Sequence, residues 1–283
     1  QCRFLFTCSG YYDYASGYEP KFAGSENFKG TIVHPQKWDT SLNYDHKKVV
    51  VIGSGATAVT LVPEMAKRAE KVTMLQRSPT YVANLPSEDV VANFLKKVLP
   101  AKLAYSITRW KNILIALAFY NAARTWPQAI KKFILKGVKK EMGEGYDMKH
   151  FDPKYNPWDQ RLCVVPDADL FKSIKSGRAE VVTDTIEKFT ERGILLSSGK
   201  ELEADIIVTA TGLKVQLLGG MTMHVNGQSA EPKDIHCYRG VMFSDIPNFA
   251  VAIGYTNSSW TLKCDLNCDY VTKILNYMDK HHY

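Results

Sequence analysis

The chain of 283 residues is 45% hydrophobic and 23% charged, which is the ordinary composition of a globular protein with one large domain or two small ones. Its net charge of +7 is a modest excess of cations that would suit an anionic cofactor. The densest basic run, Lys131 to Lys140, falls on an expected helix, and no nucleic-acid motif accompanies it. We interpret this run as a solvated helix face, which argues against a nucleic-acid-binding protein.

The six cysteines form no CxxC pair, and no His/Cys cluster has the spacing of a zinc site, so no metal site is expected. Cys264 and Cys268 lie one helical turn apart. We interpret them as packed free thiols, although a functional pair is the alternative. Free thiols indicate a reducing, cytoplasmic compartment.

The most apolar run of the chain, residues 113–120, is far shorter than the ~20 residues that span a bilayer. It predicts a buried helix rather than a stable membrane insertion. The chain carries no signal peptide and begins at Gln1 with a strand-like run, so we expect that its N-terminus is truncated.

The first half of the chain predicts a βαβ unit. Residues 3–8 predict a short buried strand, and residues 11–46, rich in Gly, Pro, Tyr and Asp, predict an ordered loop with little regular structure. The β-branched run at 48–52 is typical of a central parallel strand. It is followed by a glycine-rich loop, a helix at 56–69 and a second strand at 72–75.

The second half predicts a helical insertion and a return to strands. Residues 88–145 have helical periodicity and predict two or three inserted helices. The elements expected after them are a loop at 146–160, short antiparallel strands within 180–198, a buried strand at 204–210, another at 249–253 and a final helix at 262–280. The order of these elements predicts an α/β, Rossmann-like fold.

The glycine-rich loop has the pattern that binds a dinucleotide. Gly53 permits the tight turn out of the strand, Gly55 lets the backbone approach a pyrophosphate, and Ala58 lets the helix pack closely on the strand. The free N–H groups and the dipole of the new helix favour phosphates. The predicted binding residues are Gly53, Ser54, Gly55, Ala56, Thr57 and Ala58.

The end of the second strand indicates which nucleotide binds. An NAD site usually has a carboxylate here for the ribose 2′-hydroxyl, but this strand ends in Gln76-Arg77-Ser78. Arg77 can pair with a 2′-phosphate in a bidentate manner. This pattern favours NADP(H) over NAD or FAD at the loop, and the alternative is that Arg77 is an ordinary surface charge.

A second motif precedes the glycine-rich loop. It reads Phe28-x-Gly30-x-x-x-His34-x-x-x-Trp38-Asp39, and it resembles the fingerprint of Baeyer–Villiger monooxygenases at every fixed position. The resemblance places this motif on a linker and implies a role in domain motion more than in chemistry.

The resemblance extends along nearly the whole chain. Residues 49–81, 156–162 and 254–263 look like the branch of ethionamide-activating monooxygenases. The strand ends at Ser9-Gly10 and Thr211-Gly212 resemble the two links that such flavoproteins run between their FAD and NADPH domains. We therefore expect an FAD-domain remnant and linker at 1–40, an NADP-binding Rossmann domain with its helical insertion at 41–212, and a returning part of the FAD domain at 213–283.

The family implies an oxidoreductase mechanism. NADPH reduces FAD, the reduced flavin traps O2 as a C4a-peroxide, and this species oxygenates a ketone or a sulfur or nitrogen centre. The family arginine that stabilises the anionic species corresponds to Arg161, and a permanent cation suits a developing anion in a dry site. The alternative is a structural arginine paired to Asp159 or Asp167. Gln160 stands where many relatives carry a basic residue, which leaves more of the phosphate binding to Arg77.

The FAD-binding GxGxxG loop that opens such enzymes is not found upstream of Gly53, and the chain stops at Tyr283, before relatives usually end. We expect truncation at both ends and weak FAD binding by this chain alone. Two alternatives remain: an N- or S-oxidising flavin monooxygenase and a non-catalytic NADP-binding module. A pyridine nucleotide–disulfide reductase is disfavoured, because the CxxxxC or CxxC redox pair that it needs is not present. The resemblance implies that the partners are O2 and a small-molecule ketone, thioether or amine.

Overall fold

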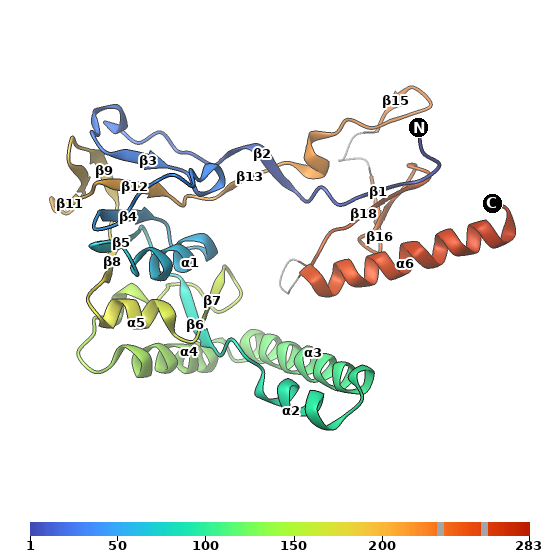
Figure 1. Ribbon diagram of the computed structural model, residues 1–283, viewed down its shortest axis with the longest axis horizontal. Coiled ribbons are helices and arrows are strands. Elements are labelled where there is room, and N and C mark those ends of the chain that lie inside the picture. The colour runs from blue at the N-terminus through green and yellow to red at the C-terminus, as the bar shows by residue number, and fades with distance from the viewer. Residues whose placement is uncertain (231–234, 256–259) are drawn as a thin grey trace. The chain divides into compact units, whose positions relative to one another are not determined.

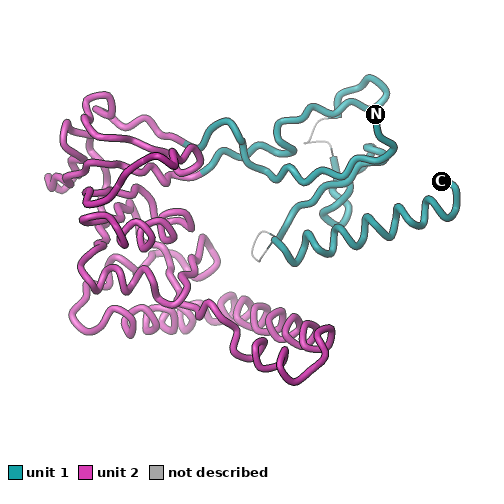
Figure 2. Tube along the Cα trace, viewed as in Figure 1, with its two compact units in different colours: residues 1–18, 213–283 teal, residues 19–212 magenta. Residues whose placement is uncertain are grey.

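The computed structural model describes residues 1–230, 235–255 and 260–283. The chain divides into two compact units, residues 19–212 and residues 1–18 with 213–283 (Figure 2). The larger unit ends at Gly212. It includes residues 19–40, of which Thr31–Val33 pair with the central sheet.

A five-stranded parallel sheet forms the centre of the larger unit (Figure 1). Its strand order is β3-β12-β4-β5-β8. From β4 the chain passes through β5 to β8 at one edge, and it later returns to β12 on the other side of β4, as in doubly wound folds. The bounds are β3 Thr31–Val33, β12 Ile206–Thr209, β4 Lys48–Ile52, β5 Lys71–Gln76 and β8 Ala179–Thr183. The expected α/β Rossmann-like fold is confirmed.

The apolar run of β4 alternates between two hydrophobic clusters because successive side chains point to opposite faces. Val49 and Val51 join a cluster with helices α1 (Ala56–Met65) and α5 (Asp169–Lys175). Val50 and Ile52 join a second cluster with an antiparallel sheet of β9 (Ile186–Phe189), β10 (Gly193–Leu196) and β11 (Glu201–Glu203). Both faces of the central sheet are therefore covered.

Two expectations about strands were wrong in part. The antiparallel strands expected within 180–198 begin only at Ile186, since Ala179–Thr183 is instead the fifth parallel strand. The loop expected at 11–46 contains β2 (Tyr12–Gly17), β3 and the short 3-10 turns η1 (Ser25–Asn27) and η2 (Pro35–Lys37). Three β-branched residues suffice for β3 because they pair with the edge of β12, a contact that local composition does not predict.

Three helices occupy the expected helical segment: α2 (Val90–Val98), α3 (Ala101–Thr125) and α4 (Pro127–Met142). They follow β6 (Tyr81–Leu85) and precede the 3-10 turn η3 (Met148–His150) and β7 (Leu162–Pro166), which pairs in parallel with β6. The buried helix expected at 113–120 is wrong in one respect: Leu114, Ile115 and Leu117 are each more than half exposed. No described helix is long and apolar enough to cross a membrane.

The smaller unit is built on β1 (Leu5–Thr7), which pairs in parallel with β18 (Phe249–Val251). The helix α6 (Trp260–His281) supplies Val271 to the core beside this pair. The remaining elements are β13 (Leu213–Val215) on β2, η4 (Leu217–Gly220), and two hairpins, β14–β15 (His224–Val225, Gln228–Ser229) and β16–β17 (Cys237–Tyr238, Met242–Phe243). All six cysteines are free thiols.

Replacing Gly53 by alanine is expected to destabilise the larger unit. Gly53 has φ +133, and a Cβ there would overlap the backbone carbonyl oxygen of Ala210. We expect Gly53→Ala to lower the free energy of unfolding by about 3 kcal/mol, measured by urea denaturation. Gly137→Ala, in the interior of α4 with open space around its Cα, should instead raise it by about 0.5–1 kcal/mol. Equal effects of the two substitutions would contradict this account of the loop.

Candidate functional site

The glycine-rich loop lies at the carboxyl end of β4, between the ends of its two neighbours in the sheet. The Gly53 N–H donates to the Leu75 carbonyl oxygen at 2.8 Å, and Ala210 packs against Gly53 from the other side. Carboxyl ends of parallel strands are where open α/β sheets bind ligands. The loop thus stands where a nucleotide would be expected.

The first turn of α1 offers free backbone donors. Gly55 is the N-cap, and no side chain caps the helix. Ala56 and Thr57 are exposed, whereas Ala58 is fully buried against the sheet. Uncapped N–H groups together with the helix dipole form a site for an anion. The residues from Gly53 to Ala58 thus form a turn that leads into an uncapped helix start.

Arg161 extends its side chain to this same turn. A Cβ built on Gly55 would lie 2.5 Å from Nη1 of Arg161, so the guanidinium rests on the Cα of the glycine. The structural alternative for Arg161 is not realised among the described residues. Asp159 pairs with Arg124 at 2.6 Å, and Asp167 accepts a hydrogen bond from the Ser87 N–H.

Two tyrosines hold the segment that carries Arg161. The Tyr155 hydroxyl donates to the Arg161 carbonyl oxygen at 2.9 Å, and the Tyr81 hydroxyl donates to the Tyr155 carbonyl oxygen at 2.6 Å. Burial raises the pKa of Tyr81 to about 12 and also raises the pKa of Tyr155, so both phenols stay protonated as donors. We did not predict either tyrosine, because their partners are backbone atoms that no sequence pattern identifies.

The residues at the end of β5 divide into one buried and two exposed positions. The buried Gln76 amide donates to the His150 carbonyl oxygen at 2.7 Å and to Thr183 Oγ1 at 2.8 Å. Arg77 and Ser78 are exposed, and no ion partner of Arg77 occurs in the described parts of the chain. Arg77 is therefore available to an anion, while Gln76 braces the strand end.

The fingerprint residues have separate structural roles. Phe28 packs edge-on against Phe189 in the second cluster, and a Cβ at Gly30 would overlap the Asp205 carbonyl oxygen. Trp38 packs on the first cluster. Hydrogen bonds from the Ser41 hydroxyl and N–H lower the pKa of the exposed Asp39.

His34 connects the fingerprint to the second crossing between the units. Its buried ring donates from Nε2 to the Gly212 carbonyl oxygen at 3.1 Å, and its Nδ1 accepts from the Gln36 N–H at 3.2 Å. This pair of bonds defines the neutral tautomer. The Thr211 hydroxyl donates to the Thr209 carbonyl oxygen at 3.4 Å. His34 thus holds the chain at the residue before it enters the smaller unit.

The smaller unit has two buried hydroxyls at the end of β1. Thr7 Oγ1 and Ser9 Oγ have no hydrogen-bond partner among the described residues. The Ser9 carbonyl accepts from the Tyr14 hydroxyl, and Gly10 has φ +68. Buried hydroxyls are normally paired, so a polar ligand at this strand end would satisfy them. Ser9 and Gly10 were predicted, and Thr7 was not.

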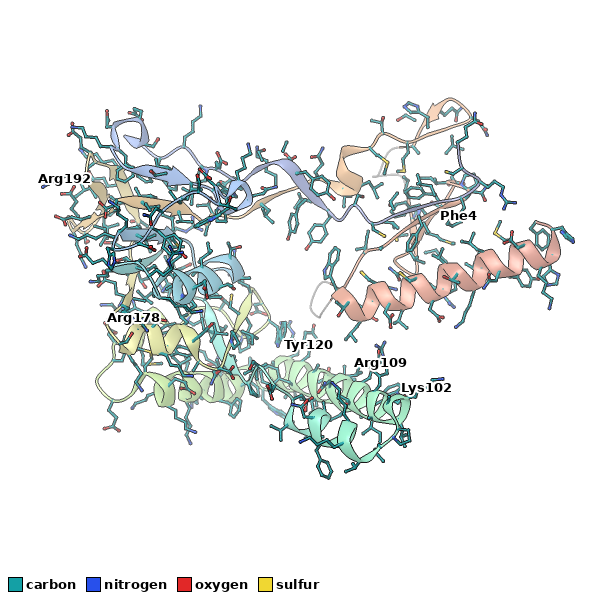
Figure 3. The ribbon with its side chains drawn as sticks, viewed as in Figure 1. Phe4, Lys102, Arg109, Tyr120, Arg178 and Arg192 are labelled. Carbon is teal, nitrogen blue, oxygen red and sulfur yellow. The ribbon has the colours of Figure 1, made fainter. Side chains whose placement is uncertain are left out.

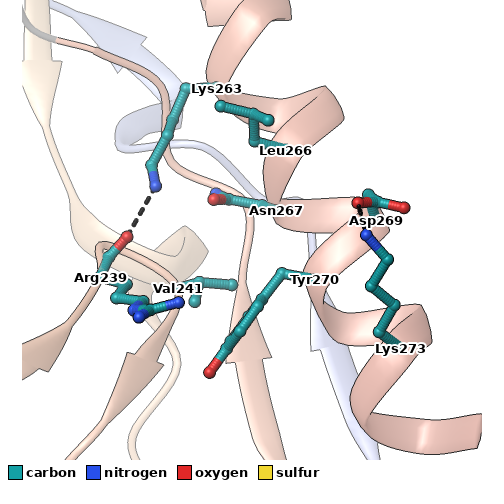
Figure 4. Close-up of a pocket in the computed structure, with 8 residues that line it drawn as sticks. All are labelled: Arg239, Val241, Lys263, Leu266, Asn267, Asp269, Tyr270 and Lys273. Carbon is teal, nitrogen blue, oxygen red and sulfur yellow. Dashed lines mark hydrogen bonds and ion pairs between the residues drawn. The ribbon is translucent and has the colours of Figure 1, made fainter.

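A shallow pocket of about 250 Å³ lies elsewhere in the smaller unit, between the β16–β17 hairpin and α6 (Figure 4). The Arg239 guanidinium lies over the rings of Tyr238 and Tyr270 there. The Lys263 ammonium donates to the Arg239 carbonyl oxygen at 2.6 Å. None of the predicted site residues lines this pocket. Within the stretch 254–263 that resembles the family, residues 256–259 lie outside the described residues.

Comparison with known proteins identifies the family of this chain. The family model "Flavin-binding monooxygenase-like" matches residues 4–253. The chain is 56% identical over 280 residues to the FAD-containing monooxygenase EthA of Mycobacterium tuberculosis, covering 98% of this chain and 57% of that protein. It is 55% identical over 282 residues to the probable FAD-binding monooxygenase AlmA of Acinetobacter baylyi, covering 99% of this chain and 57% of the relative.

Solved structures share the fold at low sequence identity. An oxidised steroid monooxygenase bound to NADP aligns with a TM-score of 0.75 at 20% identity, over 99% of this chain and 62% of its own. An open form of cyclohexanone monooxygenase aligns with a TM-score of 0.74 at 17% identity, and the alignment covers 98% of this chain and 63% of the monooxygenase chain. The chain spans 57% of the length of the two curated relatives. It belongs to the flavin-binding monooxygenase-like family.

Proposed function

We propose that the whole protein is an NADPH- and FAD-dependent monooxygenase that transfers one oxygen atom of O2 to a small organic substrate. The observation that carries this proposal is the contact of the Arg161 guanidinium with Gly55. It brings a permanent cation to the turn that binds dinucleotide phosphates. A dinucleotide and an oxygenation site then share one side of the larger unit.

NADP(H) is the cofactor that we assign to this turn. The uncapped N-terminus of α1 would bind the pyrophosphate. The exposed Arg77 would bind the 2′-phosphate, with Ser78 beside it, and Gln76 would act only by bracing the strand end. The solved steroid monooxygenase that shares this fold is described as bound to NADP.

FAD is the second cofactor, and the buried hydroxyls of Thr7 and Ser9 fit a polar ligand at the end of β1. Ser9 and Gly10 are the FAD contacts that we propose in the smaller unit. Thr211 and Gly212 are further cofactor contacts that we propose, in the larger unit. FAD supplies the redox chemistry that activates O2 when it is bound. Arg161 stabilises the negative charge that develops on oxygen during the transfer, since a fixed guanidinium needs no reorganisation.

We infer a Baeyer–Villiger reaction on a ketone, because the fingerprint from Phe28 to Asp39 is complete, and its Phe28 and His34 side chains make packing and hydrogen-bond contacts in the larger unit. Oxygenation of a sulfur or nitrogen centre is the alternative reaction at the same site. The six free thiols are consistent with a cytoplasmic enzyme.

Arg77→Ala in the full-length protein tests the choice of nucleotide. A charge-assisted bond to a phosphate contributes about 1.5–3 kcal/mol, so we expect the KM for NADPH to rise roughly 10- to 100-fold while the KM for NADH hardly changes. Arg178→Ala, which removes another exposed arginine of the same unit (Figure 3), is the matched control. Equal changes for the two nucleotides would remove Arg77 from the 2′-phosphate site.

Arg161→Ala tests the oxygenation step. Loss of one charge-stabilising group typically lowers turnover by about 10²- to 10³-fold, so formation of oxygenated product from a ketone should fall by that factor. Reduction of the flavin at saturating NADPH, followed by its absorbance, should continue at a rate close to that of the unmodified enzyme. If Arg161→Ala still makes ester at the normal rate, the role assigned to Arg161 is wrong.

A further inference from the structure

Helices α2 and α3 carry exposed apolar side chains that no described residue of the larger unit covers. On α2, Val90, Val91, Phe94 and Val98 are 75%, 49%, 61% and 55% exposed. These positions recur at helical spacing, so they form one stripe. The opposite face of α2, with the buried Ala92, packs toward α3.

A second stripe follows α3. Leu103, Ile107, Trp110, Leu114 and Leu117 recur at steps of four and three residues, and each is 41–62% exposed. Only Ala104 and Ala123 of this 25-residue helix are buried. The side chains of both helices project outward from the ribbon (Figure 3). Contiguous exposed apolar surface of this kind marks an interaction site.

The segment that carries the two stripes has an excess of basic residues. Residues 90–140 contain eleven Lys and Arg and no Asp or Glu. Lys111 is bound by Asp89 at 2.5 Å, and Lys131 by Asp152 at 2.7 Å. Lys96, Lys97 and Lys102 make no ion pair with any described residue, and they flank the apolar stripes. The partner of this face must therefore be both apolar and anionic.

We propose that α2 and α3 bind the surface of an anionic lipid bilayer, lying in its interface without crossing it. Exposed Trp, Phe and Leu beside unpaired lysines are the features of interfacial helices, and no described helix is long and apolar enough to span a membrane. A second copy of this chain is a poorer occupant, because a symmetric contact would bring the acid-free faces together and set like charges against each other. This inference does not depend on the proposed reaction.

The test uses the full-length protein and sedimentation with vesicles of phosphatidylcholine, with and without phosphatidylglycerol. We expect binding to the phosphatidylglycerol vesicles, weakened by high salt. Phe94→Glu should lower the partition coefficient by at least roughly tenfold. Tyr277→Glu, at a comparably exposed aromatic residue on α6 of the smaller unit, should leave it unchanged.

A second variant keeps the apolar stripe and removes charge. Lys96→Gln with Lys97→Gln should lower binding to phosphatidylglycerol vesicles by about 25-fold, since each lysine near an anionic surface contributes about fivefold. Both lysines are exposed, so this variant should fold even if Phe94→Glu does not. No sedimentation of the unmodified protein, or equal sedimentation of the lysine variant, would overturn the proposal. A dimer that Phe94→Glu separates, without any vesicle binding, would instead assign the face to a second copy.

Discussion

The contact between the Arg161 guanidinium and the Cα of Gly55 is the constraint on which the site depends. The contact needs a residue without Cβ at the start of α1. It also needs Arg161, more than a hundred residues further along the chain, to lie beside that turn. Tyr81 and Tyr155 make the return accurate, because each donates to a backbone carbonyl in the segment that precedes β7. The arginine is thereby aimed from a braced backbone, although its side chain is exposed.

The parallel sheet supplies the second requirement, a fixed platform for the turn. The side chains of β4 alternate between two apolar clusters, so the strand that delivers Gly53 is held on both faces. Gly53 in turn lies against the ends of β5 and β12. His34 attaches the fingerprint segment to Gly212, which couples the edge of this platform to the point where the chain leaves the unit. The contacts of the fingerprint residues within this unit are therefore packing contacts and hydrogen bonds that hold its segments together.

Much of this arrangement could be predicted from the sequence, because it depends on local patterns. The β-branched run at 48–52, the glycine spacing and the missing carboxylate after β5 all have short-range physical causes. Long-range contacts could not be predicted: β3 forms because β12 offers a free edge, and β8 joins the parallel sheet through β5. The tyrosine braces and the Thr7 hydroxyl were missed for the same reason. The exposed face of α3 was expected to be buried, because an apolar composition indicates burial. Composition alone does not identify which part of a protein would cover such a face.

The central claim is that Gly55 and Arg161 act as one unit, and a double-mutant cycle on full-length enzyme tests it directly. Gly55 has φ −82, which alanine adopts freely, and the new Cβ would displace only the flexible end of Arg161. Gly55→Ala should leave the Tm nearly unchanged and lower the rate of oxygenated product formation at saturating NADPH by roughly tenfold or more. The variant with both Gly55→Ala and Arg161→Ala should be no slower than Arg161→Ala alone. Independent, multiplying losses from the two substitutions would contradict the account.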